Sequence, residues 1–74
     1  MTDYSITKDD KLSLINSHMR SIEMNKYTSE LIVLEQEALE NSDEAAVSRA
    51  NEQIASANLQ LVALQAQKEA VESE

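Results

Sequence analysis

The most regular part of the sequence is residues 47–71, which read VSRANEQIASANLQLVALQAQKEAV. One set of positions recurs every seven residues, and a second set follows three residues after each member of the first. The first set is Val47, Ile54, Leu61 and Lys68, and the second is Ala50, Ala57, Leu64 and Val71. This 3-4-3-4 spacing is typical of a helix that packs lengthwise against another helix. We therefore expect the rest of the chain to supply the partner helix.

The composition favours an all-α fold with a single domain. The chain has 74 residues and contains no glycine, proline or cysteine, and its aromatic residues are Tyr4 and Tyr27. A β-rich fold would lack its usual turn residues, whereas long helices need neither glycine nor proline. The absence of cysteine also excludes disulfides and thiolate metal sites.

The charge balance excludes two classes of partner. Fourteen acidic and six basic residues give a formal charge of −8, whereas binding to nucleic acid or to an anionic membrane requires a basic surface. The longest run without charged residues, 53–67, is too short and too polar to span a bilayer, and no signal-like segment begins the sequence. The sequence therefore predicts a cytoplasmic protein with an acidic surface.

The predicted elements are two long helices joined by a turn. Residues 1–6 are expected to form a flexible lead-in, with Thr7 as the N-cap of a helix over 8–40. The break is at residues 41–43, where Asn41 or Ser42 is expected to cap a second helix over 43–72. A connection this short predicts an antiparallel hairpin, resembling a two-stranded coiled coil.

The apolar seam of the first helix is not fixed by the sequence. One stripe runs through Leu12, Ile15, Met19 and Ile22 and then continues with Tyr27, Leu31, Leu34 and Ala38, after an irregular step of five. Another stripe starts at Met24 and shares the later residues in heptad spacing. Folding the chain about Ser42 brings position n near position 84 − n and predicts the following hairpin seam: Ile15, Met19, Ile22, Tyr27, Leu31, Leu34, Val47, Ala50, Ile54, Ala57, Leu61, Leu64 and Val71.

A second apolar line lies on the far side of the second helix, and uncharged Asn and Gln residues flank it. Residues 31–34 are apolar on every side of the first helix, which indicates that more than one neighbouring helix covers this segment. We therefore predict a homodimer that forms a four-helix bundle; a trimer and a monomeric hairpin are the alternatives. The predicted oligomer interface comprises Ile32, Val33, Ala55, Leu59, Val62, Ala66 and Ala70.

No residue pattern indicates catalysis, a cofactor or a metal site. His18 has no histidine or glutamate three or four residues away with which to share a metal ion. Five acidic residues crowd the turn, with Arg49 as the only nearby basic residue and no companion His or Cys, and we interpret them as a solvated acidic tip: Glu35, Glu37, Glu40, Asp43 and Glu44. The sequence therefore predicts a protein that is not an enzyme.

Three segments carry a resemblance to a family: residues 11–16 (KLSLIN), 26–31 (KYTSEL) and 64–68 (LQAQK). They resemble small helical proteins encoded by tailed phages of marine cyanobacteria. The resemblance implies an accessory or virion-associated phage protein, located in the host cytoplasm or in the virion. It assigns no functional residue.

Two functions are compatible with these features. The first is a structural or protein-interaction module that self-associates through its second helix. The second is a small acidic regulator or decoy that binds a basic surface on a host or viral protein. In both hypotheses the partner is a protein: a second copy of this chain or a different one.

Overall fold

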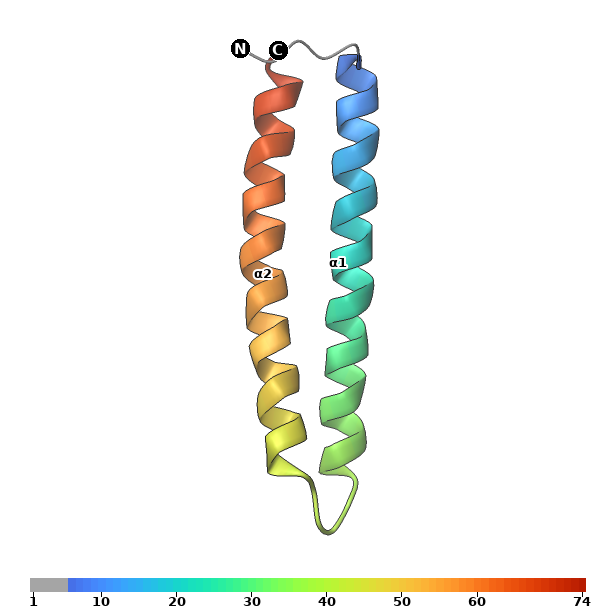
Figure 1. The fold of residues 1–74 in the computed structure, drawn as a ribbon, viewed down its shortest axis with the longest axis vertical. Coiled ribbons are helices and arrows are strands. Elements are labelled where there is room, and N and C mark those ends of the chain that lie inside the picture. Colours follow the sequence, from blue (N-terminus) through green and yellow to red (C-terminus); the bar gives the residue numbers. More distant parts are fainter. Residues whose placement is uncertain (1–5) are drawn as a thin grey trace.

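The computed structural model describes residues 6–74 and contains two α-helices. Helix α1 spans Lys8–Glu37 and α2 spans Glu44–Glu72. They lie side by side and antiparallel, and they form a rod of 55 × 18 × 17 Å (Figure 1). The predicted all-α hairpin is therefore confirmed. Most of the predicted lead-in, residues 1–5, lies outside the described residues.

Helix α1 begins with a complete capping box. The Asp10 N–H donates to the Thr7 hydroxyl at 3.1 Å, and the Thr7 N–H donates to the Asp10 carboxylate at 3.2 Å. Asp9 and Asp10 also place negative charge in the first turn, where the N–H groups of the helix end favour it. Thr7 is thus the N-cap that the sequence predicts, and Asp10 takes the role that glutamate or glutamine usually has in this motif.

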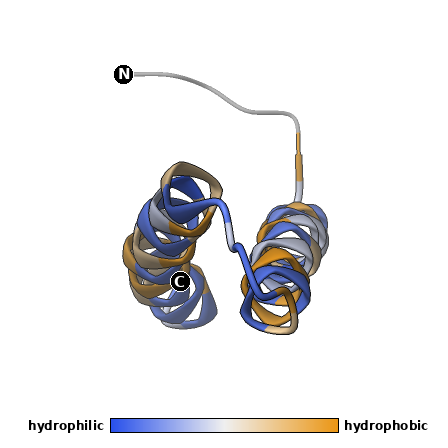
Figure 2. Ribbon diagram, turned by 90° about the horizontal axis from the view of Figure 1, so that it is seen from below, coloured by the Kyte–Doolittle hydropathy of each residue, from blue (hydrophilic) through white to orange (hydrophobic). Residues whose placement is uncertain are grey.

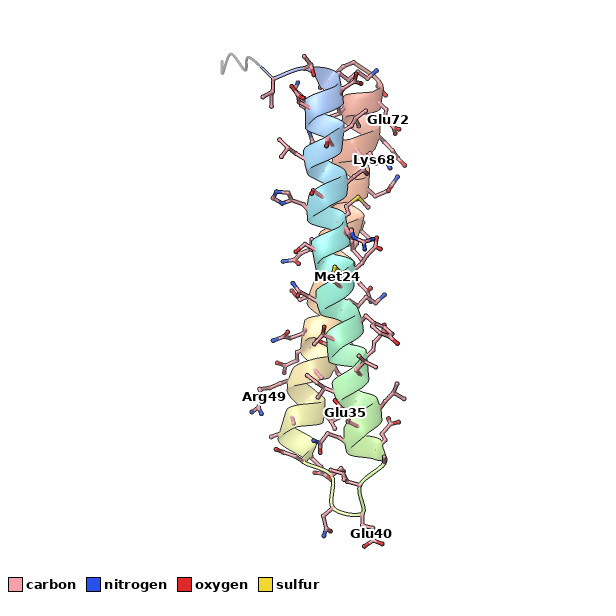
Figure 3. All side chains as sticks on the ribbon, turned by 90° about the vertical axis from the view of Figure 1, so that its right-hand side faces the viewer. Met24, Glu35, Glu40, Arg49, Lys68 and Glu72 are labelled. Carbon is pink, nitrogen blue, oxygen red and sulfur yellow. The ribbon has the colours of Figure 1, made fainter. Side chains whose placement is uncertain are left out.

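Helix α1 ends earlier than the predicted boundary at residue 40. Its last residue is Glu37 and its C-cap is Ala38, with no basic residue in the last turn. Glu35, Glu37 and Glu40 instead place negative charge beside the carbonyl end of the helix, which destabilises further helical turns. The connection therefore covers residues 38–43, and Glu40 lies at its tip (Figure 3).

Helix α2 is capped by Asp43, and the predicted caps Asn41 and Ser42 are wrong. The Asp43 carboxylate accepts hydrogen bonds from the N–H groups of Ala45 and Ala46 at 3.0 and 3.2 Å. The Asp43 N–H donates in turn to the Gln36 side-chain oxygen at 2.8 Å. This bond ties the start of α2 to the last turn of α1, so it selects Asp43 among three residues with good capping chemistry.

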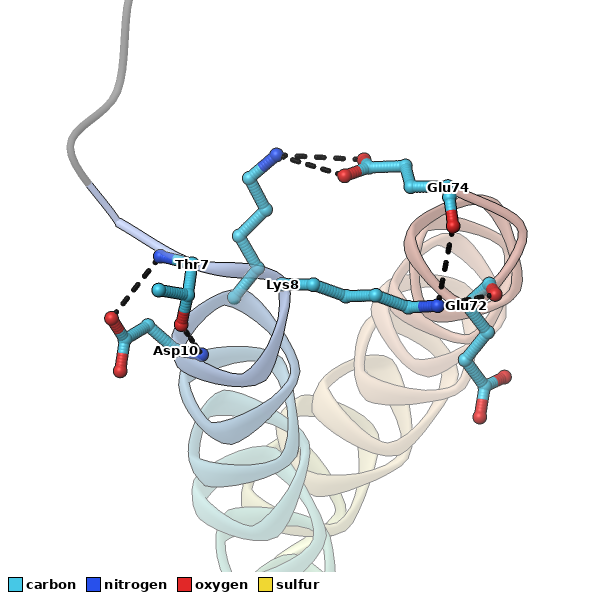
Figure 4. Close-up of polar contacts among 6 residues, drawn as sticks. Thr7, Lys8, Asp10, Glu72 and Glu74 are labelled. Carbon is cyan, nitrogen blue, oxygen red and sulfur yellow. Dashed lines mark hydrogen bonds and ion pairs between the residues drawn. The ribbon is translucent and has the colours of Figure 1, made fainter.

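The opposite end of the hairpin is held by lysines of α1 that contact the end of α2 (Figure 4). Lys8 Nζ donates to the backbone oxygen of Glu72 at 2.9 Å and to that of Glu74 at 3.4 Å. Lys11 Nζ lies 3.1 Å from the Glu74 carboxylate. Both lysines are at the positive end of α1, where their charge is unfavourable. Here they instead neutralise the negative end of α2, which favours the antiparallel arrangement.

The core between the helices is thin. The buried apolar side chains of the described residues are Ala50, Ala57 and Val71, whereas ten larger apolar residues are exposed. The end-on view shows apolar colour on the outward sides of both helices as well as between them (Figure 2). The hairpin thus leaves much of its apolar surface in contact with solvent.

Candidate interaction surfaces

The seam of α1 follows an unbroken 3-4-3-4 row. Every member of the row is buried or half-buried: Leu12, Ile15, Met19, Ile22, Lys26, Ser29, Val33 and Gln36. Ser29 is the most buried of them, with 4% of its surface exposed. The row passes through three polar residues, and for that reason a prediction based on apolar residues missed it beyond Ile22. Strict continuation of the spacing from Leu12 was the signal that could have found it.

The predicted seam is wrong at three positions of α1. Tyr27 is 59% exposed and Leu34 is 60% exposed, and Leu31 is also exposed. A five-residue step from Ile22 to Tyr27 would rotate the contact face by about 140°, since each residue turns the helix by about 100°. Two straight helices cannot follow such a rotation, so the contact continues through Lys26 and Ser29 instead.

The seam residues predicted on α2 are all buried or half-buried. They are Val47, Ala50, Ile54, Ala57, Leu61, Leu64 and Val71, and Lys68 is half-buried in the same row. Small side chains meet where the helices approach the turn: Ser29, Ala46 and Ala50 line one groove between α1 and α2. Lys26 lines another groove with Ala57, and the aliphatic part of its side chain can cover the seam.

The apolar residues that leave the seam form an exposed row on α1, which we call the outer stripe of α1: Met24, Tyr27, Leu31 and Leu34. Leu31 follows the seam residue Ser29 by two positions, or about 200° around the helix. Figure 3 looks at α1 from the side opposite α2 and shows Met24 on the near face. The alternative stripe noted in the sequence therefore exists, but it points away from α2.

Helix α2 carries a similar exposed row, which we call the outer line of α2: Ala55, Leu59, Val62 and Ala66. Leu59 is 74% exposed and Val62 is 69% exposed. The neighbouring positions Asn58, Ala63 and Gln65 carry no charge. Ala70 is also exposed and lies four residues after Ala66.

Two residues of the predicted oligomer interface lie elsewhere. Val33 is half-buried in the α1 seam row, so part of its side chain contacts α2. Ile32 lines a groove between the helices with Arg49 and Ala50, away from Leu59. The apolar girdle at residues 31–34 is thus divided among the seam, a groove and the outer stripe of α1.

The titratable side chains do not converge on a site within residues 6–74. No group of three or more His, Cys, Asp or Glu side chains in this range is arranged to hold a metal ion. His18 is exposed on α1. Arg49 extends away from the hairpin (Figure 3), and no ion pair joins it to Glu35 in the described part of the chain. The candidate functional features of the described residues are therefore the two exposed apolar rows on the surface of the hairpin.

A comparison with protein-family models, curated proteins and solved structures found no match to this chain. Within residues 6–74, neither helix contains a stretch apolar enough and long enough to cross a membrane.

Proposed function

We propose that the protein is a non-enzymatic structural or protein-interaction module that self-associates through the outer line of α2. The observation that carries this proposal is the exposure of Leu59 and Val62 in the middle of a long helix. Burying an exposed apolar row contributes about 25 cal/mol per Å². Residues 53–67 carry no charge, so two copies can bury the middle of this row without removing a charge from water. The acidic residues Glu23 and Glu69 border one end of the row, where they line a groove with Val62 and Ala66.

A twofold axis is the simplest symmetry for such an assembly. In a twofold dimer both copies contribute the same patch to the interface. A twofold axis that passes between Leu59 and Val62 would bring the two α2 helices into contact. Each α1 then lies on the outside, so the dimer contains four helices. The thin core of a single hairpin supports this proposal, because chains of this size seldom bury enough apolar surface alone.

Two aspartate substitutions test the proposal. In Leu59→Asp, the charge lies in the proposed interface and outside the seam, so we expect the helix content to persist while the molar mass falls to that of one chain. In Leu61→Asp, the charge lies in the half-buried seam, so we expect both helix content and assembly to be lost. Circular dichroism and light-scattering mass across a dilution series measure the two quantities.

Leu14→Asp is the matched control, because Leu14 is an exposed leucine of α1 that lines a groove near the chain ends, away from the outer line of α2. We expect this variant to retain the wild-type mass. A wild-type protein of single-chain mass at every concentration contradicts the proposal, and so does a Leu59→Asp variant that assembles like the wild type.

The charge distribution favours a second candidate function, that of a small acidic regulator or decoy of a basic protein. Residues 30–44 contain six acidic residues and no basic residue. Capture of a basic nucleic-acid-binding protein that is lost at high salt supports this candidate. Self-association that is insensitive to salt, without such capture, supports the first. An accessory or virion-associated role in a phage, in the host cytoplasm or the virion, stays a prediction under either function.

A further inference from the structure

The two exposed apolar rows differ in the charge of their rims. The outer line of α2 lies within residues 53–67, which contain no charged residue, and acidic side chains border it only at one end, where Glu23 and Glu69 line a groove with Val62 and Ala66. The outer stripe of α1 is bordered on one side by Glu23, Glu30 and Glu37, which recur every seven residues. Glu30 lies three residues after Tyr27 and four before Leu34, so these side chains are neighbours on the helix surface.

The acidic rim of α1 is not neutralised within the hairpin. In residues 6–74, no ion pair engages Glu23, Glu30 or Glu37. Glu35 lies four residues after Leu31 and adds negative charge on the other side of the stripe. Arg20 lines a groove with Glu23, Met24 and Tyr27 at the start of the stripe, so negative charge is unopposed chiefly around Glu30 and Glu37. A second copy of α1 would bring these glutamates close to like charges, which disfavours the contact. Self-pairing of this stripe is therefore unfavourable.

We infer that the outer stripe of α1 is a docking surface for an amphipathic helix of another protein whose apolar row is flanked by lysine or arginine. The apolar side chains provide the area, and the glutamates at heptad spacing select basic residues at the matching positions of the partner. From Met24 to Leu34 the stripe extends about 15 Å along α1, which corresponds to three turns of a partner helix.

This surface lies on the side of α1 that faces away from α2, so the partner helix and a second copy on α2 occupy opposite edges of the hairpin. The inference therefore does not depend on the self-association proposed above. It gives the second candidate function a defined surface and a defined class of partner.

The test uses the full chain and a fluorescein-labelled helical peptide of about 18 residues, somewhat longer than the stripe. The peptide has leucine and alanine at 3-4 spacing with lysine on both sides. Two matched peptides replace the lysines with glutamate or scramble the order of the same residues. We expect saturable binding of the basic amphipathic peptide in fluorescence anisotropy, weaker at about 500 mM than at about 50 mM salt, and no binding of the other two.

Variants of the protein locate the binding surface. Leu31→Ser/Leu34→Ser removes half of the stripe, and Glu30→Lys/Glu37→Lys reverses its rim; we expect each to weaken binding at least about tenfold. The matched controls on α2, Leu59→Ser/Val62→Ser and Glu52→Lys/Glu69→Lys, are expected to bind as the wild type does. Circular dichroism checks that each variant is helical. Because the two α1 variants change different side chains, one apolar and one acidic, they test the apolar stripe and its acidic rim separately.

The inference is overturned by any of three results: no binding of the basic amphipathic peptide, equal binding of the scrambled peptide, or equal loss of binding in the α1 and α2 variants. Equal binding of the scrambled peptide means attraction by charge alone. Light-scattering mass of the same variants reports self-association separately, so failure of peptide binding is distinguished from failure of the dimer.

Discussion

At the scale of single residues, the ends of the helices depend on a few short polar side chains. Asn41, Ser42 and Asp43 all have the chemistry of an N-cap, and the structure uses Asp43, which bonds to two N–H groups of α2 while Gln36 accepts from its own N–H. The Gln36 side chain thus bonds directly to the residue that caps a helix beginning eight residues later.

Replacing Asp43 with alanine tests this assignment. We expect Asp43→Ala to lower the free energy of unfolding by about 1 kcal/mol, because two N–H groups lose their acceptor. Ser42→Ala is the control and is expected to change stability by less than about 0.5 kcal/mol, as an exposed loop substitution does. Urea unfolding followed by circular dichroism measures both. A larger loss in Ser42→Ala would show that Ser42 is the cap.

At the scale of the elements, each helix has an inner row that packs and an outer row that does not. On α1 the inner row contains Lys26, Ser29 and Gln36, whereas the outer stripe contains Tyr27, Leu31 and Leu34. The geometry of two straight helices therefore outweighs the hydrophobicity of individual residues near the turn. Small residues of α2, such as Ala50, make this possible because they let the helices approach closely.

Substitutions at two neighbouring positions distinguish the inner row from the outer one. We expect Ser29→Leu to lower the free energy of unfolding by about 1–3 kcal/mol, because the larger side chain does not fit between the helices. Leu31→Ser is expected to cost less, about 0.5–1 kcal/mol in dilute solution, since 38% of Leu31 is exposed and it lies outside the seam row. Thermal unfolding measures both, with Ser29→Ala as a tolerated control. If the seam passed through Leu31, the order of the two effects would be reversed.

At the scale of the whole molecule, the hairpin is a slender rod with little buried apolar surface. Its long axis is 55 Å and its other two axes are 18 and 17 Å, so each residue has few neighbours beyond its own helix. The contacts at its open end are exposed lysine–carboxylate and lysine–carbonyl contacts. Exposed ion pairs of this kind contribute roughly 0–1 kcal/mol each. In the proposed function, assembly therefore adds to the stability of a hairpin that is only weakly stabilised by its own contacts.

Stabilisation by assembly has a direct thermal consequence. If two chains unfold together, the midpoint of thermal unfolding rises with protein concentration by roughly 4 °C per tenfold, since association stabilises the folded chain. Calorimetry or circular dichroism over two decades of concentration measures this shift. Leu59→Asp is the control, and its midpoint is expected to be independent of concentration. A wild-type midpoint that does not move contradicts a dimer coupled to folding.

The two helices, their antiparallel arrangement, the Thr7 cap and the seam of α2 could be predicted from the sequence, because these depend on local capping chemistry and on a regular apolar period. The sequence did not determine the seam of α1 beyond Ile22, the cap of α2 or the end of α1. These depend on which side chains of one helix meet the other across the chain: Ser29 is buried because the helices approach closely there, and Asp43 is the cap because Gln36 is within reach. Contacts between the two helices therefore set these features, and the same contacts leave the outer stripe of α1 outside the core.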